Sequence, residues 1–201
     1  MATYKQGILG PFSGKVGTVV GSSWRGIAYI RSLATKVANP RTQAQVAARN
    51  RLAEVASKLR PFANIIRAGF VNQGAMSPWS AAVKRNMSHV EETQDGYKMY
   101  LDSMEISDGT ANFTVTPTVT ATSADFEWTA PEMTDDFYGA RLYAGAYNAK
   151  NGKSTTTSAD LTANEASMSL TDITTGEADE VHVYYFVATS SLSTVTSHVK
   201  A

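Results

Sequence analysis

Hydrophobic and polar positions follow two different periodicities along the chain, and the change falls between about residues 90 and 97. Before it, apolar residues such as Ala48, Leu52, Val55 and Leu59 recur at the spacing of one helix face. After it, the sequence alternates and is rich in Thr, Val, Tyr and Phe, which is typical of strands. The pattern therefore predicts helices in the first half and an all-β second half.

The chain begins with a glycine-rich segment, residues 7–32, in which short apolar pieces are separated by glycines. Glycine at this density permits positive φ angles and close approach of backbones, but it costs too much entropy for a helix interior. We expect short strands, or an extended arm, joined by turns at these glycines: Gly7, Gly10, Gly14, Gly17, Gly21 and Gly26.

Three helices are predicted between about residues 40 and 90. Asn39 followed by Pro40 is a favourable helix start, with Asn as the N-cap and Pro at the first helical position. Pro61 ends or kinks this first helix, residues 62–70 resume an apolar helical pattern, and Ser77-Pro78 repeats the cap-plus-proline signal. The spacing places Arg41, Arg49 and Arg51 toward solvent or a partner.

Seven short strands are predicted in the second half, with turn residues at 108–109, 151–152 and 175–176. Their number and length are typical of an antiparallel sandwich. The predicted fold is α+β in two parts, a glycine-rich and helical domain over 1–92 and a β-sandwich domain over 97–201. The expected strands are 99–106, 111–116, 124–129, 140–147, 167–170, 181–188 and 195–199.

Charge separates the same two parts, although the formal net charge of the chain is zero. Residues 1–90 contain thirteen cations and one acid, Glu54, which gives a net charge of +12, and residues 91–201 carry −12. Fields of this size steer association with oppositely charged partners. The first half is therefore expected to bind an anionic partner.

Two groups of cations and aromatic residues in the first half are candidates for this contact. The first group lies in the glycine-rich arm: Lys15, Trp24, Arg25 and Arg31. The second group lies on the predicted helices: Arg41, Arg49, Arg51, Lys58, Arg60, Arg67, Lys84 and Arg85.

The partner could be nucleic acid or protein. A helix-turn-helix is disfavoured because the link at residues 72–77 is longer than that motif allows, whereas nonspecific phosphate binding stays open. An acidic protein surface is also supplied by the second half of the chain. Contact between subunits would be head-to-tail and would build a ring or filament, and docking within one chain is the alternative.

The residue patterns contain no recognisable catalytic or metal motif. Gly14-Lys15 is followed by Val16, where a phosphate loop needs Ser or Thr, and no nucleophile has an evident base. His89, His182 and His198 are scattered and are interpreted as structural. Acidic loops at 135–136 and 177–180 are expected to be solvated rather than to bind calcium. We predict a non-enzymatic protein without metal or cofactor.

Disulfides and thiolate metal sites are excluded because the chain has no cysteine. The first residues lack the apolar stretch of a signal peptide, and no run of about 18 apolar residues occurs. Synthesis in the cytosol without membrane insertion is therefore expected.

Part of the second half resembles a fibronectin type III module. Residues 122–131, with Trp128 and Pro131, look like its tryptophan-bearing second strand, and residues 181–188 look like its tyrosine-bearing strand before the last hairpin. The resemblance covers about 110–201. It implies an immunoglobulin-like sandwich and names no ligand.

The first half, through residues 5–10, 12–21, 24–27 and 39–45, resembles an uncharacterised family of Bacteroidetes and of phages and prophages that infect them. This resemblance implies a virion structural protein, such as a capsid decoration, neck or tail component, that is made in the host cytoplasm and contacts itself or other virion proteins. The alternatives are a nucleic-acid-associated protein and a surface adhesin that uses the β module.

Overall fold

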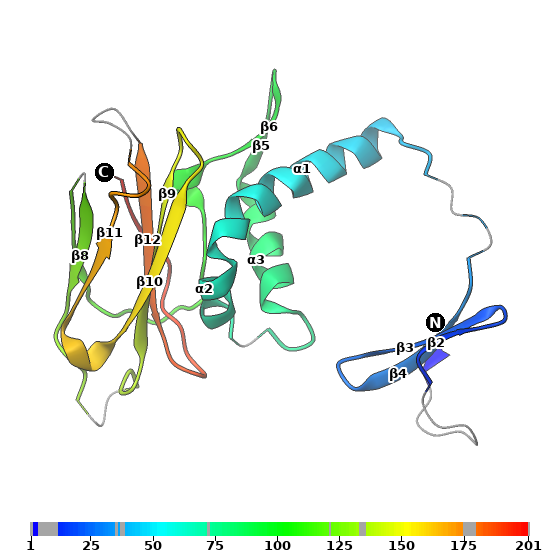
Figure 1. Ribbon diagram of the computed structural model, residues 1–201, viewed down its shortest axis with the longest axis horizontal. Helices are drawn as coiled ribbons and strands as arrows, with labels where there is room; N and C mark the ends of the chain where they lie inside the picture. The colour runs from blue at the N-terminus through cyan, green and yellow to red at the C-terminus, as the bar shows by residue number, and fades with distance from the viewer. Residues whose placement is uncertain are drawn as a thin grey trace. The chain divides into compact units, whose positions relative to one another are not determined.

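A computed structural model of the 201-residue chain describes residues 2–3, 12–34, 36, 39–71, 73–120, 122–132, 136–174 and 180–200. The chain divides into two compact units, residues 1–42 and 43–201 (Figure 1). This division falls well before residues 92–97, where the change in charge and periodicity predicted a boundary. The reason is that the helices share a hydrophobic core with the strands that follow them.

The N-terminal unit contains a four-stranded antiparallel sheet of order β1-β4-β3-β2. Arg25 and Gly26 link β3 to β4 with φ angles of 48° and 78°, the positive values that a tight two-residue hairpin requires. The predicted short strands and glycine turns are confirmed for residues 14–32, and residues 7–11 of that segment lie outside the described residues. The strands are β1 (Ala2–Thr3), β2 (Gly14–Val16), β3 (Val19–Trp24) and β4 (Ile27–Ser32).

Three helices open the C-terminal unit, as the periodicity predicted. Ser77 caps the third helix by accepting a hydrogen bond from the Ser80 amide at 3.2 Å. The first helix begins at Gln43 and not at Pro40, because Arg41 takes a left-handed φ of 47° that interrupts the helix. The helices are α1 (Gln43–Leu59), α2 (Ala63–Gly69) and α3 (Pro78–Asn86), with 3₁₀ turns η1 (Arg60–Phe62) and η2 (Met87–His89).

The remaining strands form three antiparallel sheets: β10-β9-β12-β13, β11-β8-β7 and the hairpin β5-β6. The fold is mixed α+β and mostly β. The strands are β5 (Val90–Thr93), β6 (Gly96–Met99), β7 (Thr116–Val119), β8 (Ser123–Glu127), β9 (Arg141–Asn148), β10 (Ser154–Asp160), β11 (Glu165–Ser169), β12 (Val181–Ala188) and β13 (Ser197–Lys200).

Two strand predictions were wrong, and the strands β5, β6 and β10 were missed. Residues 99–106 contain the 3₁₀ turn η3 (Leu101–Ser103) rather than a strand, and β7 begins at Thr116, where the strand predicted over 111–116 was expected to end. Strand β10 was missed because it is rich in Ser and Thr and half-exposed, so no hydrophobic alternation marks it.

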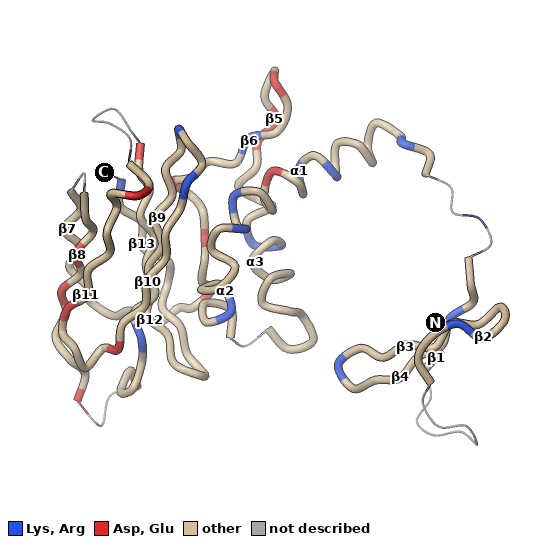
Figure 2. Tube along the Cα trace, viewed as in Figure 1, with Lys and Arg blue, Asp and Glu red and all other residues tan. Residues whose placement is uncertain are grey.

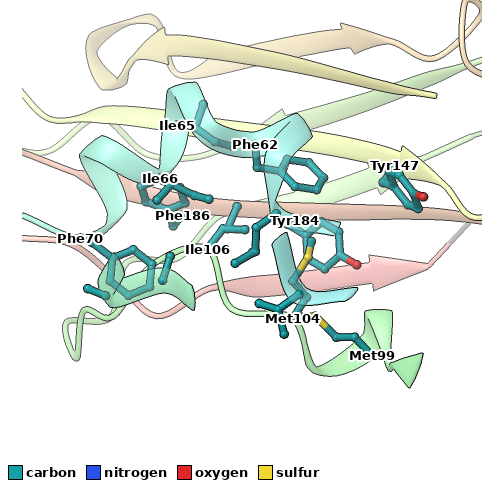
Figure 3. Packing of buried hydrophobic residues seen from close by; sticks show 14 of the residues in the cluster. Phe62, Ile65, Ile66, Phe70, Met99, Met104, Ile106, Tyr147, Tyr184 and Phe186 are labelled. Carbon is teal, nitrogen blue, oxygen red and sulfur yellow. The ribbon is translucent and has the colours of Figure 1, made fainter. Parts of the chain in front are cut away.

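The helices of the C-terminal unit pack against one face of the sheet β10-β9-β12-β13 through a cluster of buried side chains around Phe62 (Figure 3). The Phe62 ring meets the Tyr184 ring of β12 edge-on, with centroids 5.5 Å apart. Gly145 of β9 permits this approach, because a Cβ there would lie 2.6 Å from the Phe62 ring. The helices and the sheet therefore form one body.

The other face of the same sheet shares a second core with the sheet β11-β8-β7. Leu142 and Val183 face Phe126 and Met168 there, and the Trp128 indole donates a hydrogen bond to the Leu161 carbonyl at 2.6 Å. Figure 1 shows the sheet β10-β9-β12-β13 between the helices and the sheet β11-β8-β7. Both faces of its central strands are covered, which explains why seven of the eight residues of β12 are buried.

Candidate functional site

The N-terminal sheet brings three of the four predicted arm residues onto one face. Residues directly opposite in an antiparallel pair share a face, and Lys15 lies opposite Val20, which lies opposite Arg31. Alternation along the strands places Trp24 on this face too. We define the cationic sheet face by Lys15, Val20, Trp24, Ile27, Tyr29 and Arg31.

This face combines exposed apolar groups with unbalanced positive charge. The Trp24 and Ile27 residues are 53% and 52% exposed, and the Arg25 guanidinium lies 5.1 Å from the centre of the Trp24 ring. The first acid in the sequence is Glu54, so residues 1–42 hold six cations and no acid. Exposed aromatic residues beside arginine are typical of protein interfaces.

The predicted helical surface is divided by the fold, because some of its cations make internal contacts. Arg51 was expected to face solvent or a partner, and this was wrong. Its Nη2 donates to the carbonyl oxygens of Met87 and Val90 at 3.4 and 3.5 Å, and its guanidinium lies 5.9 Å from the centre of the Tyr97 ring. Arg51 therefore ties α1 to η2 and to the hairpin β5-β6.

Two further candidates, Lys58 and Arg85, also make contacts within the chain. Lys58 Nζ donates to the Tyr147 hydroxyl at 3.4 Å, and Arg85 Nε pairs with Glu105 at 2.6 Å. Arg41, in the N-terminal unit, and Arg49, on α1, are exposed. The remaining cations of the predicted group are exposed, lie on η1, α2 and α3, and form no ion pair with any residue that the structure describes: Arg60, Arg67 and Lys84.

An acidic surface lies on the outward side of the sheet β11-β8-β7. Phe126 and its neighbours Ala124 and Met168 face the core, so alternate residues face outward. Glu127 lies directly opposite Glu165, and strand alternation places Asp125 on the same side. Figure 2 shows acidic positions in red along β8 and β11. Like charges directly opposite across strands are destabilising. We call this surface the acidic sheet face: Thr116, Thr118, Asp125, Glu127, Glu165 and Ser167.

A third feature is a cluster of two histidines and one aspartate in the C-terminal unit. His182 on β12 and His198 on β13 share a face, because Tyr184 lies opposite His198 and Lys200 lies opposite His182. His182 Nδ1 lies 3.0 Å from His198 Nε2. Asp102 Oδ1, from η3, lies 3.4 Å from the first nitrogen and 3.8 Å from the second.

The surroundings of the cluster favour neutral imidazoles. Burial lowers the pKa of His182, and burial followed by the neighbouring His182 lowers the pKa of His198. Glu180 Oε1 lies 3.2 Å from His182 Nε2 and is itself paired with Lys200. A pocket of about 240 Å³ opens beside the cluster, lined in part by Asp102, Glu180 and His182.

The three histidines are scattered in the sequence, which predicted structural roles for them, yet the fold brings two of the three together with an aspartate. His182 and His198 are sixteen residues apart, and Asp102 is eighty residues from His182. Two consecutive predicted strands carry these histidines, and this is the signal that could have predicted that they lie close together. Using it requires knowing the register in which the two strands pair. His89 lies elsewhere, 3.0 Å from Glu105.

The fold and these surfaces define a mixed α+β protein of mostly antiparallel strands with oppositely charged sheet faces. The chain belongs to a family of unknown function (DUF6266), which matches residues 11–199. No curated protein matches the chain. Within the described residues, no helix combines the length and apolar composition needed to cross a membrane.

Proposed function

We propose that this protein is a non-enzymatic assembly protein, in which the cationic sheet face of one copy binds the acidic sheet face of the next. The observation that supports this proposal is the pairing of opposite charge on two sheet faces. Lys15 and Arg31 have no acid within their own unit, and Glu127 lies opposite another acid, Glu165. Each face would therefore gain a counter-charge from the other.

The charge of the two units supports contact between copies of one chain. Residues 1–42 carry +6, and residues 43–201 carry −6. A contact between different faces of identical copies is head-to-tail and extends into a ring or a filament. Electrostatic complementarity sets the encounter rate and the register, while Trp24 and Ile27 supply the apolar anchors that dominate affinity at interfaces.

In the finer form of the proposal, the assembly is a virion of a Bacteroidetes phage or prophage. The protein would then be a capsid decoration, neck or tail component, with its C-terminal strands forming an immunoglobulin-like sandwich for display. This form of the proposal rests on two resemblances. Segments within residues 5–45 resemble phage-associated sequences, and residues 110–201 resemble a fibronectin type III module. Contacts with other virion proteins would use the same cationic sheet face.

Light scattering coupled to size exclusion tests the assembly at low and high salt. The wild-type chain should form oligomers that dissociate as salt screens the charges. The double variant Lys15→Glu with Arg31→Glu should be monomeric at low salt. A matched control, Lys150→Glu with Lys153→Glu, changes the net charge equally on the turn between β9 and β10 and should still assemble.

A charge swap distinguishes this specific contact from general attraction. Adding Glu127→Lys and Glu165→Lys to the double variant exchanges the signs of the two faces and should restore oligomers. A wild-type chain that is monomeric at every salt and protein concentration would contradict the proposal, as expected if its two units dock within one chain.

A second candidate function, nonspecific binding of single-stranded nucleic acid, is favoured by one observation. Trp24 and Tyr29 share the cationic sheet face with Lys15 and Arg31, and aromatic platforms beside cations bind unpaired bases and phosphates. Fluorescence anisotropy with a labelled oligonucleotide tests it. Binding that weakens steeply with salt and is lost in Trp24→Ala would support it, and no binding at low salt would remove it. The adhesin alternative stays a prediction.

A further inference from the structure

The Asp102, His182 and His198 cluster has the spacing of metal ligands. The three facing atoms are 3.0, 3.4 and 3.8 Å apart. Zinc binds nitrogen and carboxylate oxygen at about 2.0–2.2 Å in tetrahedral geometry, so two of its ligand atoms are separated by roughly 3.3–3.5 Å. The three atoms of the cluster therefore form a triangle close to one face of a zinc tetrahedron.

Hydrogen bonding explains why these atoms can act as ligands. Glu180 Oε1 lies 3.2 Å from His182 Nε2 and can accept a hydrogen bond from its N–H, which leaves the Nδ1 lone pair facing His198 and Asp102. A carboxylate behind a ligating histidine fixes the tautomer and ring orientation at metal sites. Lys200 holds Glu180 in turn, and His182 is 3% exposed, so its ring cannot turn away to solvent.

An ordinary hydrogen-bond network accounts for the cluster less well than a cation does. With the Nε2 proton of His182 directed to Glu180, a single N–H from His198 faces both His182 Nδ1 and Asp102 Oδ1. That single N–H would then have two acceptors. A divalent cation would satisfy all three facing atoms at once. Imidazole with carboxylate selects zinc and its first-row neighbours, whereas calcium and magnesium take oxygen ligands.

We propose that Asp102, His182 and His198 bind a divalent transition-metal ion, with zinc as the defining probe. The ion would join three separate segments: η3, the central strand β12 and the C-terminal strand β13. Its binding would therefore stabilise the C-terminal unit, because the unfolded chain does not hold the three ligands together. This site is independent of the proposed assembly contact.

Titration of the full chain with zinc, followed by calorimetry and by thermal unfolding, tests the site. Wild type should bind one zinc ion per chain in this cluster, and its unfolding temperature should rise with zinc concentration, while calcium and magnesium leave it unchanged. Asp102→Asn and His198→Gln should each weaken zinc binding at least tenfold. Asp102 has a side chain 70% exposed, so its variant should keep the fold.

His89→Gln is the matched control, because it removes a histidine that pairs with Glu105 outside the cluster. It should bind zinc as the wild type does. Circular dichroism without metal verifies that the His198→Gln chain is folded before its affinity is compared. The proposal is overturned if wild type shows no saturable zinc binding, or if Asp102→Asn and His198→Gln bind zinc as tightly as His89→Gln.

Discussion

The N-terminal sheet and the four-stranded sheet of the C-terminal unit are both antiparallel, but they bury very different amounts of side chain. Among the described residues of the N-terminal unit that have an assigned burial, Gly21 alone is buried, whereas strand β12 buries seven of eight residues. The difference arises because helices and a second sheet cover both faces of β12. A sheet without such cover gains little stability from its own packing, and its side chains Trp24 and Ile27 are more than half exposed.

The largest expected effect on the free energy of unfolding comes from removing the contact that joins the helices to the sheet β10-β9-β12-β13. Phe62→Ala empties a fully buried site against Tyr184 and should lower the free energy of unfolding by about 3–5 kcal/mol. Trp24→Ala, in the uncovered N-terminal sheet, should change it by less than about 0.5 kcal/mol. Urea unfolding followed by circular dichroism measures both. Equal losses would mean that the two sheets are stabilised alike.

The next effect concerns the small packing contact inside the N-terminal sheet. Phe12 covers Gly21 so closely that a Cβ there would lie 2.5 Å from the Phe12 ring and carbonyl. Gly21→Val should displace Phe12 at a cost of about 1–3 kcal/mol and reduce hydrogen-exchange protection in residues 12–32 alone. Ser23→Val, on the same strand and face, is the control. Loss of protection in the C-terminal unit as well would show that the units unfold together.

Acid should weaken the C-terminal unit through His182, which is buried, and His198, which is half-buried. Burial lowers the pKa of His182 and His198 from the ordinary 6.5, although Asp102 and Glu180 oppose this effect. The unfolded chain then takes up protons at a higher pH than the folded chain. Stability is therefore full above about pH 6.5 and falls as the pH drops below it.

Unfolding temperatures between pH 7.5 and 5 measure this dependence in metal-free buffer. The His198→Gln variant should have a shallower dependence than wild type, and His89→Gln should keep the wild-type profile. A wild-type temperature that rises as the pH falls through this range would contradict the prediction.

The smallest effect concerns the repulsion on the acidic sheet face. Glu127→Gln removes one of two acids that lie directly opposite across β8 and β11, and it should stabilise the isolated chain by about 0.2–1 kcal/mol. Glu92→Gln, opposite Tyr97 on the hairpin β5-β6, is the control and should be neutral. Under the assembly proposal the same Glu127→Gln change should weaken oligomers, so stability and association move in opposite directions.

Local signals predicted the elements that depend on neighbouring residues. The Ser77-Pro78 cap and the glycine turns of the N-terminal sheet are set by the conformations of a few adjacent residues, and the structure contains them. Helical periodicity also predicted the contacts of Val55 and Leu59, which are fully buried. It failed for Ala48 and Leu52 on the same stripe, because the first half of α1 has no covering layer in the described residues and leaves Leu52 48% exposed.

The sequence by itself determined the charge asymmetry, the glycine hairpins and the mixture of helices and strands, because these follow from composition and short-range periodicity. Only the tertiary structure decided the boundary between units, the internal role of Arg51 and the meeting of Asp102 with His182 and His198. These features depend on which strands pair, in which register, and on what packs against them. Contacts between residues that are sixteen positions apart, as for the two histidines, or eighty, as for Asp102 and His182, leave no local pattern in the sequence.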